Sequence, residues 1–301
     1  MASRVTYNFC SDEYEDNTVD MIQQVTALHG HPAKKMHDLS RPILELKDVS
    51  VHFNNIVALS HITFELQRGE RVAIVGPNGA GKSTLFNVIS GVVVPTQGET
   101  NVYGYAPDEH ICIAYVPQRS QVDWEFPVNV ADVVMMGRVR KLGLFRWPRR
   151  KDWDLVQEAL GLVGMQHLAQ RQIGELSGGQ QQRVFIARAL AQEAELMLMD
   201  EPLTGLDLRS QEDIFAVLET LRRRQVTILV ATHDLNLAAE RFDRLMLLNQ
   251  RLIGFGQAGE VFTPALLSQA YSGSMRLIET PNGWMYISDS CCSHGEEPVR
   301  A

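Results

Sequence analysis

The sequence predicts an α/β fold, in which buried parallel strands alternate with helices. Three short runs are nearly continuous in apolar residues, at 71–75, 196–199 and 226–232. Strands of a parallel sheet have this composition because helices cover both faces of the sheet. The first run leads directly into a glycine-rich loop and then into a helix that we expect over Lys82–Ile89.

Alternating apolar and polar residues predict antiparallel strands outside this parallel sheet. The alternation runs over 43–53 and again over 58–66, with a turn at Asn54 between the two runs. Near the C-terminus, the segment 278–288 has the pattern of a small hairpin around an Asn-Gly pair that begins at Asn282. Helices are expected over 151–163, 179–192, 209–224 and 235–241.

The composition narrows the class of protein. With 301 residues, 45% hydrophobic and 21% charged, the chain matches a soluble globular protein. A formal net charge of −8 gives no reason to expect a nucleic acid as a partner. No run approaches the ~18 consecutive apolar residues of a membrane-spanning helix, and the N-terminus lacks the basic-then-apolar order of a secretory signal. We therefore expect a cytosolic chain, which would act at a membrane only through membrane-spanning partners.

The two ends of the chain carry weaker signals. Residues 1–41 have little apolar periodicity and an acidic cluster, so we expect a flexible extension with a short helix near 19–28. Its histidines could bind a metal, although scatter in an unstructured segment is the favoured interpretation. The four cysteines lack zinc-site spacing and are interpreted as free thiols. In the tail, Cys291, Cys292 and His294 form an incomplete ligand set, which favours a floppy tail over a metal-sensing site.

The glycine-rich loop has the pattern GxxxxGK[ST], which binds the phosphates of a nucleoside triphosphate. Its glycines let backbone N–H groups close around phosphate oxygens, and Lys82 places a point charge on the terminal phosphates. Ser83 has the hydroxyl that ligates Mg²⁺ in such loops. The predicted phosphate site consists of Gly76, Pro77, Asn78, Gly79, Ala80, Gly81, Lys82, Ser83 and Thr84.

An acidic pair, Asp200 and Glu201, ends the second buried strand. Because strand side chains alternate, the two carboxylates point in different directions. Hydrolysis of a nucleoside triphosphate needs a magnesium ligand and a group that orients and deprotonates water. We therefore predict that Asp200 holds Mg²⁺ with Ser83 and that Glu201 is the catalytic base. The alternative is an acidic pair that simply ends a strand in solvent, and the glycine-rich loop in the same chain disfavours it.

The segment from Leu176 to Gln180 reads LSGGQ, which is the signature of the ATP-binding-cassette (ABC) ATPases. With the glycine-rich loop, it identifies the chain as a member of that superfamily over about residues 43–260. The resemblance implies a RecA-like P-loop NTPase core with an antiparallel β subdomain and an inserted α-helical subdomain at about 119–176. It implies ATP and Mg²⁺ as cofactors. The implied domains are a flexible N-terminal extension (1–41), an ABC ATPase domain (42–272) and a C-terminal hairpin with a flexible tail (273–301).

The resemblance assigns roles to four residues outside the loop and the acidic pair. Phe53 falls where the family places an aromatic residue that stacks on adenine, although Tyr is commoner there and a core aromatic is the alternative. Gln118 matches the glutamine that reaches Mg²⁺ and links the site to the helical subdomain. His233 matches the histidine that contacts the γ-phosphate, and Asp207 matches the residue that communicates between paired subunits. With Glu201, the last three form the predicted catalytic set.

The signature segment is expected to act on a second copy of the chain. Ser177, Gly178, Gly179 and Gln180 open a helix, and the N–H groups at a helix N-terminus bind anions. In the family this segment completes the ATP site of the partner subunit. The resemblance therefore implies a head-to-tail homodimer with two shared ATP sites, whose opening and closing is the power stroke.

The spacing of the motifs separates the classes of ABC protein. Only 118 positions separate Lys82 from Asp200, which leaves no room for the long coiled coil of the chromosome-maintenance class. A single set of motifs argues against the two-cassette chains of the translation-associated class. The resemblance thus implies the separate ATPase subunit of a bacterial importer, at the cytoplasmic face of the cell membrane. Its implied partners are two integral membrane permease subunits and, indirectly, an extracytoplasmic metal-binding protein.

The segment after Gln118 bears on the cargo. Residues 122–128 read VDWEFPV, which resembles the ATPases of manganese, zinc and iron importers. Trp124, Phe126 and Pro127 would offer an apolar docking groove to the permease, and packing in the core of the helical subdomain is the alternative. We expect a divalent metal ion as cargo, Mn²⁺ first and Zn²⁺ or Fe²⁺ next.

Three alternative functions stand beside this prediction. The first keeps the ATPase and changes the cargo to a siderophore or haem. The second is a soluble ATP-driven switch that acts on an assembly other than a transporter. The third is a phosphoryl-transfer kinase, which is disfavoured because it leaves the signature segment and His233 unexplained.

One basic stretch is not explained by any of these motifs. Residues 137–151 carry seven Lys and Arg residues around two aromatic residues. A membrane-facing or partner-facing patch has this composition, and so does a solvated loop before a helix. The sequence leaves both interpretations open.

Overall fold

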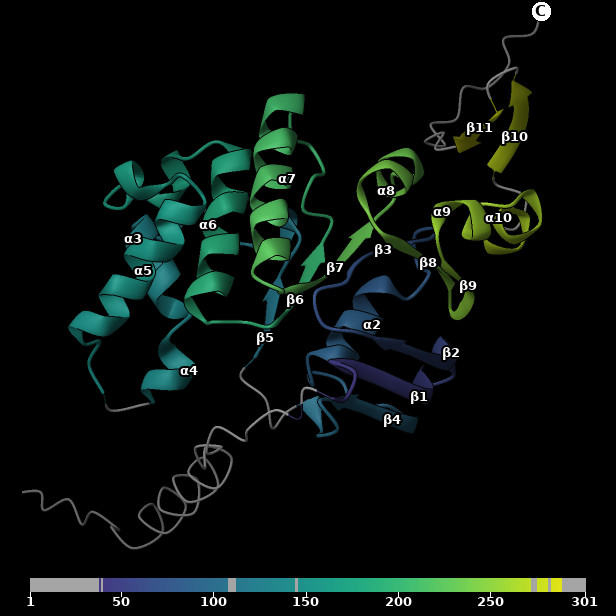
Figure 1. Cartoon of the computed structure of the whole chain (residues 1–301), viewed down its shortest axis with the longest axis horizontal. Helices are drawn as coiled ribbons and strands as arrows, with labels where there is room; N and C mark the ends of the chain where they lie inside the picture. Colours follow the sequence, from purple (N-terminus) through teal and green to yellow (C-terminus); the bar gives the residue numbers. More distant parts are fainter. Residues whose placement is uncertain are drawn as a thin grey trace, which may run out of the picture. The chain divides into compact units, whose positions relative to one another are not determined.

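A six-stranded sheet contains the buried parallel strands predicted from the sequence (Figure 1). Its strand order is β5-β6-β7-β3-β8-β9, in which the first five strands are parallel and β9 pairs antiparallel with β8. The strands are β3 (Arg71–Val75), β5 (Ile113–Val116), β6 (Leu196–Asp200), β7 (Thr227–Thr232), β8 (Arg244–Asn249) and β9 (Arg251–Gly256). The computed structural model describes residues 38, 40–107, 112–143, 146–271, 275–280 and 283–288.

Alternate side chains of the central strands enter two separate cores. Val72 and Ile74 of β3 lie in one core, Ala73 and Val75 lie in the other, and all four are fully buried. The leucines and methionines of β6 divide between the two cores in the same way. Both faces of the sheet are therefore covered, and the α/β fold predicted from the apolar runs is confirmed.

An antiparallel sheet and one helix cover the first face. In that sheet β1 (Leu44–Phe53) lies between β2 (Ile56–Leu66) and β4 (Gln97–Val102), and the predicted turn at Asn54 joins β1 to β2. The helix α2 (Lys82–Ile89) follows the glycine-rich loop and buries its apolar side chains in the same core. The loop is thus fixed between a buried strand and a buried helix.

A layer of helices covers the opposite face. Within this layer α3 packs on α5 and α6, and α6 also packs on α7. Val134, Leu160 and Ile186 are fully buried where these helices meet. The helices of the layer are α3 (Val130–Met136), α4 (Val139–Leu142), α5 (Arg150–Leu162), α6 (Gly178–Ala191), α7 (Leu208–Arg223) and α8 (Leu235–Arg241).

The predicted elements agree closely with the structure, and several further strands were not predicted. The helix α8 has its predicted bounds, while α5, α6 and α7 each begin and end one residue earlier than predicted. The sequence analysis gives no strand at β4, β5, β8 or β9. These strands are 4–6 residues long, a length similar to that of the predicted strands β3 and β6.

The C-terminal part of the chain contains the predicted hairpin strands. After α9 (Ala258–Val261) and α10 (Pro264–Tyr271), β10 (Met275–Thr280) pairs antiparallel with β11 (Gly283–Ser288). Thr280 pairs with Gly283, so this glycine, predicted to belong to the turn, is the first residue of β11. Residues 281–282, which include Asn282 of the predicted turn, lie outside the described residues.

Several predictions concern parts of the chain beyond the described ranges. The expected N-terminal helix near 19–28 and the tail cysteines Cys291 and Cys292 belong to those parts. The described residues all lie in the unit His37–Ala301. Of the four cysteines, Cys112 falls in the described ranges, where it is buried. In those same ranges, no helix combines the length and the apolar character needed to cross a membrane.

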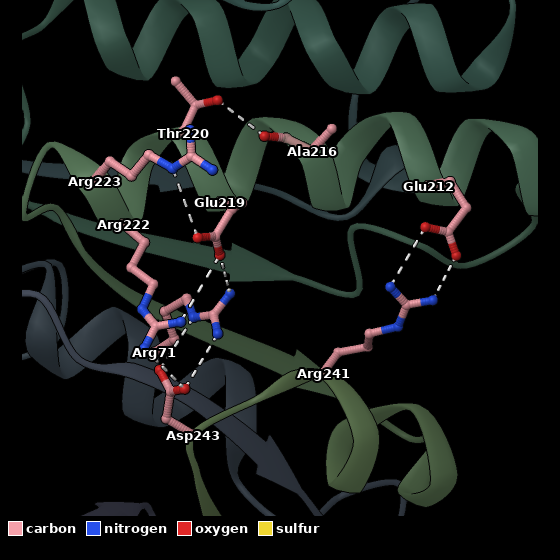
Figure 2. Close-up of polar contacts among 9 residues, drawn as sticks. All are labelled: Arg71, Glu212, Ala216, Glu219, Thr220, Arg222, Arg223, Arg241 and Asp243. Atoms are coloured by element: carbon pink, nitrogen blue, oxygen red, sulfur yellow. Dashed lines mark hydrogen bonds and ion pairs between the residues drawn. The ribbon is translucent and has the colours of Figure 1, made fainter.

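Ion pairs fix α7 against the strands and helix beside it (Figure 2). Arg71 at the start of β3 lies 3.3 Å from Glu219 of α7 and 3.1 Å from Asp243, which precedes β8. Nearer the N-terminus of α7, Glu212 pairs at 2.5 Å with Arg241, the last residue of α8. Solvent-exposed pairs contribute little each, roughly 0.2–1 kcal/mol, so their effect here is to fix orientation. Asp207 and His233 lie just before α7 and α8 and are positioned by these helices.

Candidate functional site

The glycine-rich loop and the acidic pair meet in one cleft of about 400 Å³. It lies at the carboxyl ends of β3 and β6, where ligands bind in open parallel sheets. Gln118, which follows β5, also reaches this cleft. The lining residues are Ile56, Val57, Ala58, Asn78, Gly79, Ala80, Gly81, Lys82, Ser83, Thr84, Gln118, Asp200, Glu201 and Gln250.

Close backbone contacts explain two of the glycines in the loop. A Cβ atom on Gly76 would lie 2.0 Å from the carbonyl oxygen of Leu248. Gly81 has a φ of 95°, and a Cβ there would lie 2.6 Å from the carbonyl oxygen of Ala58. Only glycine satisfies both the positive φ and the short distance. The loop is therefore held against β2 and β8 with its backbone close to the cleft.

Lys82 is the buried cation of the cleft. Its side chain is 8% exposed, and Nζ donates hydrogen bonds to the carbonyl oxygens of Gly76 at 2.8 Å and Pro77 at 3.1 Å. Burial lowers the pKa of Lys82, while the charges of Glu201 and Asp200 act to raise it. The ammonium group lies at the first turn of α2, whose N-terminus favours anions. A phosphate group fits both features.

Asp200 lies within hydrogen-bonding distance of two hydroxyl groups. Ser83 Oγ donates to Asp200 Oδ2 at 2.8 Å, and Tyr115 Oη donates to the same oxygen at 3.3 Å. Burial, together with the charge and hydrogen bond of Asp200, raises the pKa of Tyr115 to about 12, so its hydroxyl stays protonated. Tyr115 was not predicted as a site residue. Its position at the end of β5, next to β6, brings it to the carboxylate.

The donor set around Asp200 fits a magnesium ion. A carboxylate and a serine hydroxyl, 2.8 Å apart, are the hard oxygen ligands that Mg²⁺ prefers. The described residues contain no group of three or more His, Cys, Asp and Glu side chains that could hold a metal alone.

Glu201, which lines the cleft, lies next to His233. Glu201 Oε2 lies 3.1 Å from His233 Nδ1 and accepts a hydrogen bond from Thr204 Oγ1 at 2.8 Å. The backbone of Glu201 has a φ of 47°, in the left-handed region, and its N–H donates to the carbonyl of Ala231. Glu201 thus lies in a turn just past the end of β6, where the alternation of strand side chains no longer applies. A carboxylate 14% exposed, beside a histidine, is suited to accept a proton from water.

Gln118 lies where the cleft meets a second cavity of about 350 Å³. This second cavity is lined by Gln118, Arg119, Ser120, Val122, Trp124, Glu201 and Thr204. Of the predicted docking residues, Trp124 lines the cavity and packs edge-on against Phe185, whereas Phe126 is 56% exposed. Gln118 and Glu201 thus belong to both hollows.

The signature segment does not line the phosphate cleft of its own chain. Ser177 and Gln180 instead cap the start of α6: Ser177 N donates to Gln180 Oε1 at 3.0 Å, and Gln180 N donates to Ser177 Oγ at 3.4 Å. A Cβ on Gly179 would lie 2.6 Å from the side chain of Ser210, so this glycine allows α6 to approach α7. Asp207 caps α7 by accepting a hydrogen bond from the backbone N–H of Ser210. This hydrogen bond is the main reason that the pKa of Asp207 is lowered.

Phe53 also lies outside the lining of the cleft. It is the last residue of β1, 48% exposed, and Ile56, Val57 and Ala58 beyond the turn line the cleft instead. Gln250, at the turn between β8 and β9, was likewise not predicted. Its backbone N–H donates to Ala80 and its carbonyl accepts from Ser60, so it joins the loop to β2. No motif points to these four residues, since they reach the cleft only through tertiary packing.

Comparisons with known proteins give a consistent family. A family model described as "ABC transporter" matches residues 59–204. The manganese transport system ATP-binding protein MntB of Halalkalibacterium halodurans is 45% identical over 252 residues, which cover 82% of this chain and 99% of the relative. The manganese transport system ATP-binding protein MntB of Bacillus subtilis is 43% identical, covering 78% of this chain and 95% of the relative.

Zinc and chelate transporters are similar as well. The zinc transport system ATP-binding protein TroB of Treponema pallidum is 43% identical, covering 80% of this chain and 91% of the relative. A solved structure of a metal-chelate type ABC transporter in an inward-facing conformation matches with a TM-score of 0.70 and 30% identity. That match covers 82% of this chain and 96% of the solved chain. The chain therefore belongs to the ABC transporter family, among its metal-transport ATP-binding proteins.

Proposed function

We propose that this chain is the ATP-hydrolysing subunit of a bacterial importer for a divalent metal ion. The observation that carries the proposal is a single cleft lined by the glycine-rich loop, the Ser83–Asp200 oxygen pair and Glu201, whose carboxylate contacts His233. Relatives named as ATP-binding proteins of metal transport systems support the same function.

The residues of the cleft have distinct roles in the proposed hydrolysis of ATP. The backbone of the glycine-rich loop and Lys82 bind the phosphates, and the N-terminus of α2 adds to the attraction. Ser83 and Asp200 would hold Mg²⁺, with Gln118 beside them, and the bound ion would neutralise charge on the β- and γ-phosphates. Glu201 orients and deprotonates the attacking water, and His233 contacts the γ-phosphate.

The site is completed by a second copy of the chain in this proposal. The signature segment opens α6 away from the cleft of its own subunit, so it is available to the nucleotide of a partner subunit. Leu208 directly follows Asp207 at the start of α7, and it is 81% exposed. A leucine that packs against a second subunit would be exposed in this way when one chain is viewed alone. A homodimer with two shared ATP sites follows.

The proposed setting is the cytoplasmic face of the cell membrane. Two dimerised ATPase domains, each at about 42–272, would contact two permease subunits, and the cavity beside Gln118 and Trp124 is the proposed contact. An extracytoplasmic metal-binding protein would deliver the cargo to the permease. The extension at 1–41 and the hairpin and tail at 273–301 are proposed to lie outside the catalytic domain.

Mn²⁺ is the first candidate for the cargo, and Zn²⁺ or Fe²⁺ comes next. Two of the relatives described above are named for manganese and one for zinc. A chelated metal is the second candidate, because a metal-chelate type transporter is among the similar structures. The cargo is not contacted by this subunit, so its identity is a property of the whole transporter.

Metal-dependent ATPase activity in reconstituted membranes tests the proposed function. The chain is combined with its co-purifying permease and binding protein, and Mn²⁺, Zn²⁺, Fe²⁺ and an iron chelate are compared. Selective stimulation by a free divalent ion is expected. Stimulation by the chelate alone would contradict the assignment of a free metal ion as the cargo. The absence of any co-purifying permease would contradict the proposed role in transport.

A further inference from the structure

Five exposed cations and an exposed tryptophan form a patch that the ATP site does not use. Trp147 is 89% exposed, and five of the basic residues near it in sequence are exposed as well. We define the basic patch as Arg140, Arg146, Trp147, Arg149, Arg150 and Lys151. It extends from the end of α4 to the first turn of α5, on the helical layer (Figure 1).

The residues beneath the patch are neutralised, whereas the patch itself is not. Arg138 is 6% exposed and binds Asp152, at 3.2 Å, and Glu193, at 2.7 Å. Lys141 pairs with the same Glu193 at 2.5 Å. In contrast, none of the five cations of the patch makes an ion pair with another residue that the structure describes. The inner network holds the outer charges on a fixed support.

Local stability does not explain these charges. Arg150 and Lys151 are the first two residues of α5, where the helix dipole disfavours cations. A large apolar side chain such as Trp147, left 89% in water, gains nothing from folding. The first exposed acid further along α5 is Asp154, and the chain as a whole carries a net charge of −8. The patch is therefore a local excess of positive charge on an acidic protein.

We propose that the basic patch binds the anionic headgroups of a lipid bilayer. Arg and Lys near an anionic leaflet gain about 1 kcal/mol each, and tryptophan prefers the headgroup level because one part of its ring system is apolar and its N–H is polar. Because the patch is positively charged, it should bind an anionic bilayer more strongly than a neutral bilayer. The biological role of this binding rests on the proposed function at the membrane. Binding of the full chain to vesicles nevertheless tests the inference without measuring transport.

The experiment measures binding of the purified full chain to vesicles by co-sedimentation. Vesicles of phosphatidylcholine alone are compared with an equal mixture of phosphatidylcholine and phosphatidylglycerol. Binding to the anionic vesicles only, and weaker binding in high salt, is expected. Each cation removed should lower the partition coefficient about fivefold, so R146Q/R149Q/R150Q should lower it by well over tenfold. Trp147→Ser should weaken binding with its salt dependence unchanged.

A matched control removes the same charge elsewhere. The variant K47Q/R223Q/R251Q loses three exposed cations outside the patch and should bind the anionic vesicles as the unmodified chain does. Binding of a fluorescent ATP analogue reports that each variant is folded. It also separates a failure of this inference from a failure of the ATPase function, because nucleotide binding does not involve the patch.

Two results would overturn the inference. One is equal binding of both vesicle types, or of the patch and control variants to the anionic vesicles. The other is loss of permease co-purification in detergent by the patch variant while its vesicle binding is unchanged. That second result would assign the patch to a protein partner.

Discussion

The glycine-rich loop and the signature segment both open a helix, but their helix N-termini differ. At α2, the cap residue Gly81 provides no side-chain hydrogen bond, and the loop before it lines the phosphate cleft. At α6, Ser177 and Gln180 cap each other's backbone N–H groups and lie outside that cleft. The first N-terminus is arranged to bind phosphate within its own chain.

In the proposed dimer, one chain holds parts of two ATP sites. The loop, Asp200 and Glu201 line one cleft, so the proposed phosphate loop, magnesium ligands and base all come from one subunit. The signature segment has the anion-binding character of a helix N-terminus but no phosphate site of its own chain beside it. To bind phosphate in a partner, the Ser177 hydroxyl must point away from its capping bond with Gln180, a bond already 3.4 Å long.

The largest effect is expected from changing the proposed base in the first region. Glu201→Gln should lower the turnover number by about 10²- to 10⁴-fold, because the amide cannot accept the proton of water. ATP binding should remain, and the bound nucleotide should hold the dimer closed. Steady-state ATPase assays and the molar mass of the ATP complex by light scattering measure both. Full activity in this variant would exclude Glu201 as the base.

A comparable loss is expected from the second region, with a different signature. Ser177→Arg places a long cation where the partner's nucleotide would bind. Hydrolysis should fall by at least about tenfold, which corresponds to the loss of one good transition-state contact. The affinity of the same subunit for ATP should not change, because Ser177 lies outside its own cleft. Normal turnover in this variant would contradict the shared site.

A smaller change sharpens the account of the first region. Tyr115→Phe removes the hydroxyl that donates to Asp200 and keeps the ring that packs edge-on against Phe86. A lost hydrogen bond to a charged group is worth about 1 kcal/mol or more, so the Mg²⁺ concentration for half-maximal effect should rise about fivefold. Titration of Mg²⁺ with a fluorescent nucleotide measures this. Nucleotide affinity without Mg²⁺ is the internal control, and an unchanged Mg²⁺ titration would remove Tyr115 from the site.

The smallest effect concerns the helical layer that carries the signature segment. Burial acts to raise the pKa of Glu193, but hydrogen bonds from Lys141 and Arg138 and their charges lower it to about 2. A carboxylate with a depressed pKa stabilises the fold above its ordinary value of 4.5, and that stability is lost as the pH falls toward about 2. Glu193→Gln should therefore flatten the fall of the melting temperature over this window.

The matched control for that measurement is Glu158→Gln, another exposed acid of the same layer that pairs with an arginine. It is expected to retain the slope of the unmodified chain. An identical pH dependence in the unmodified chain and in Glu193→Gln would show that the inner network under the basic patch adds no acid-sensitive stability.

The sequence predicted the parts of the site that are contiguous in the chain. The glycine-rich loop, the acidic pair after β6 and the signature segment each depend on local backbone geometry, and local geometry follows from a short pattern. The helix bounds were predicted nearly to the residue for the same reason, because α7 and α8 begin at the capping acids Asp207 and Asp234.

Contacts between distant segments could not be predicted in this way. Tyr115 reaches Asp200 because β5 and β6 are neighbours in the sheet. The sequence of neither strand reveals which strand lies beside it. Gln250 reaches the loop through the turn after β8, a strand that the sequence analysis missed. The composition of the sequence revealed the basic patch. That its cations make no ion pair with the described residues depends on which acids the fold brings near them.

The central claim is that each ATP site is shared between two copies, and mixing two inactive variants tests it most directly. Lys82→Ala disables the phosphate loop, and Ser177→Arg disables the signature segment. In a mixed dimer under this account, one site combines both defects while the other combines an intact loop with an intact signature. ATPase activity should therefore reappear when the two inactive proteins are combined. A mixture that stays inactive at every ratio, although mixed dimers form, would contradict the shared site.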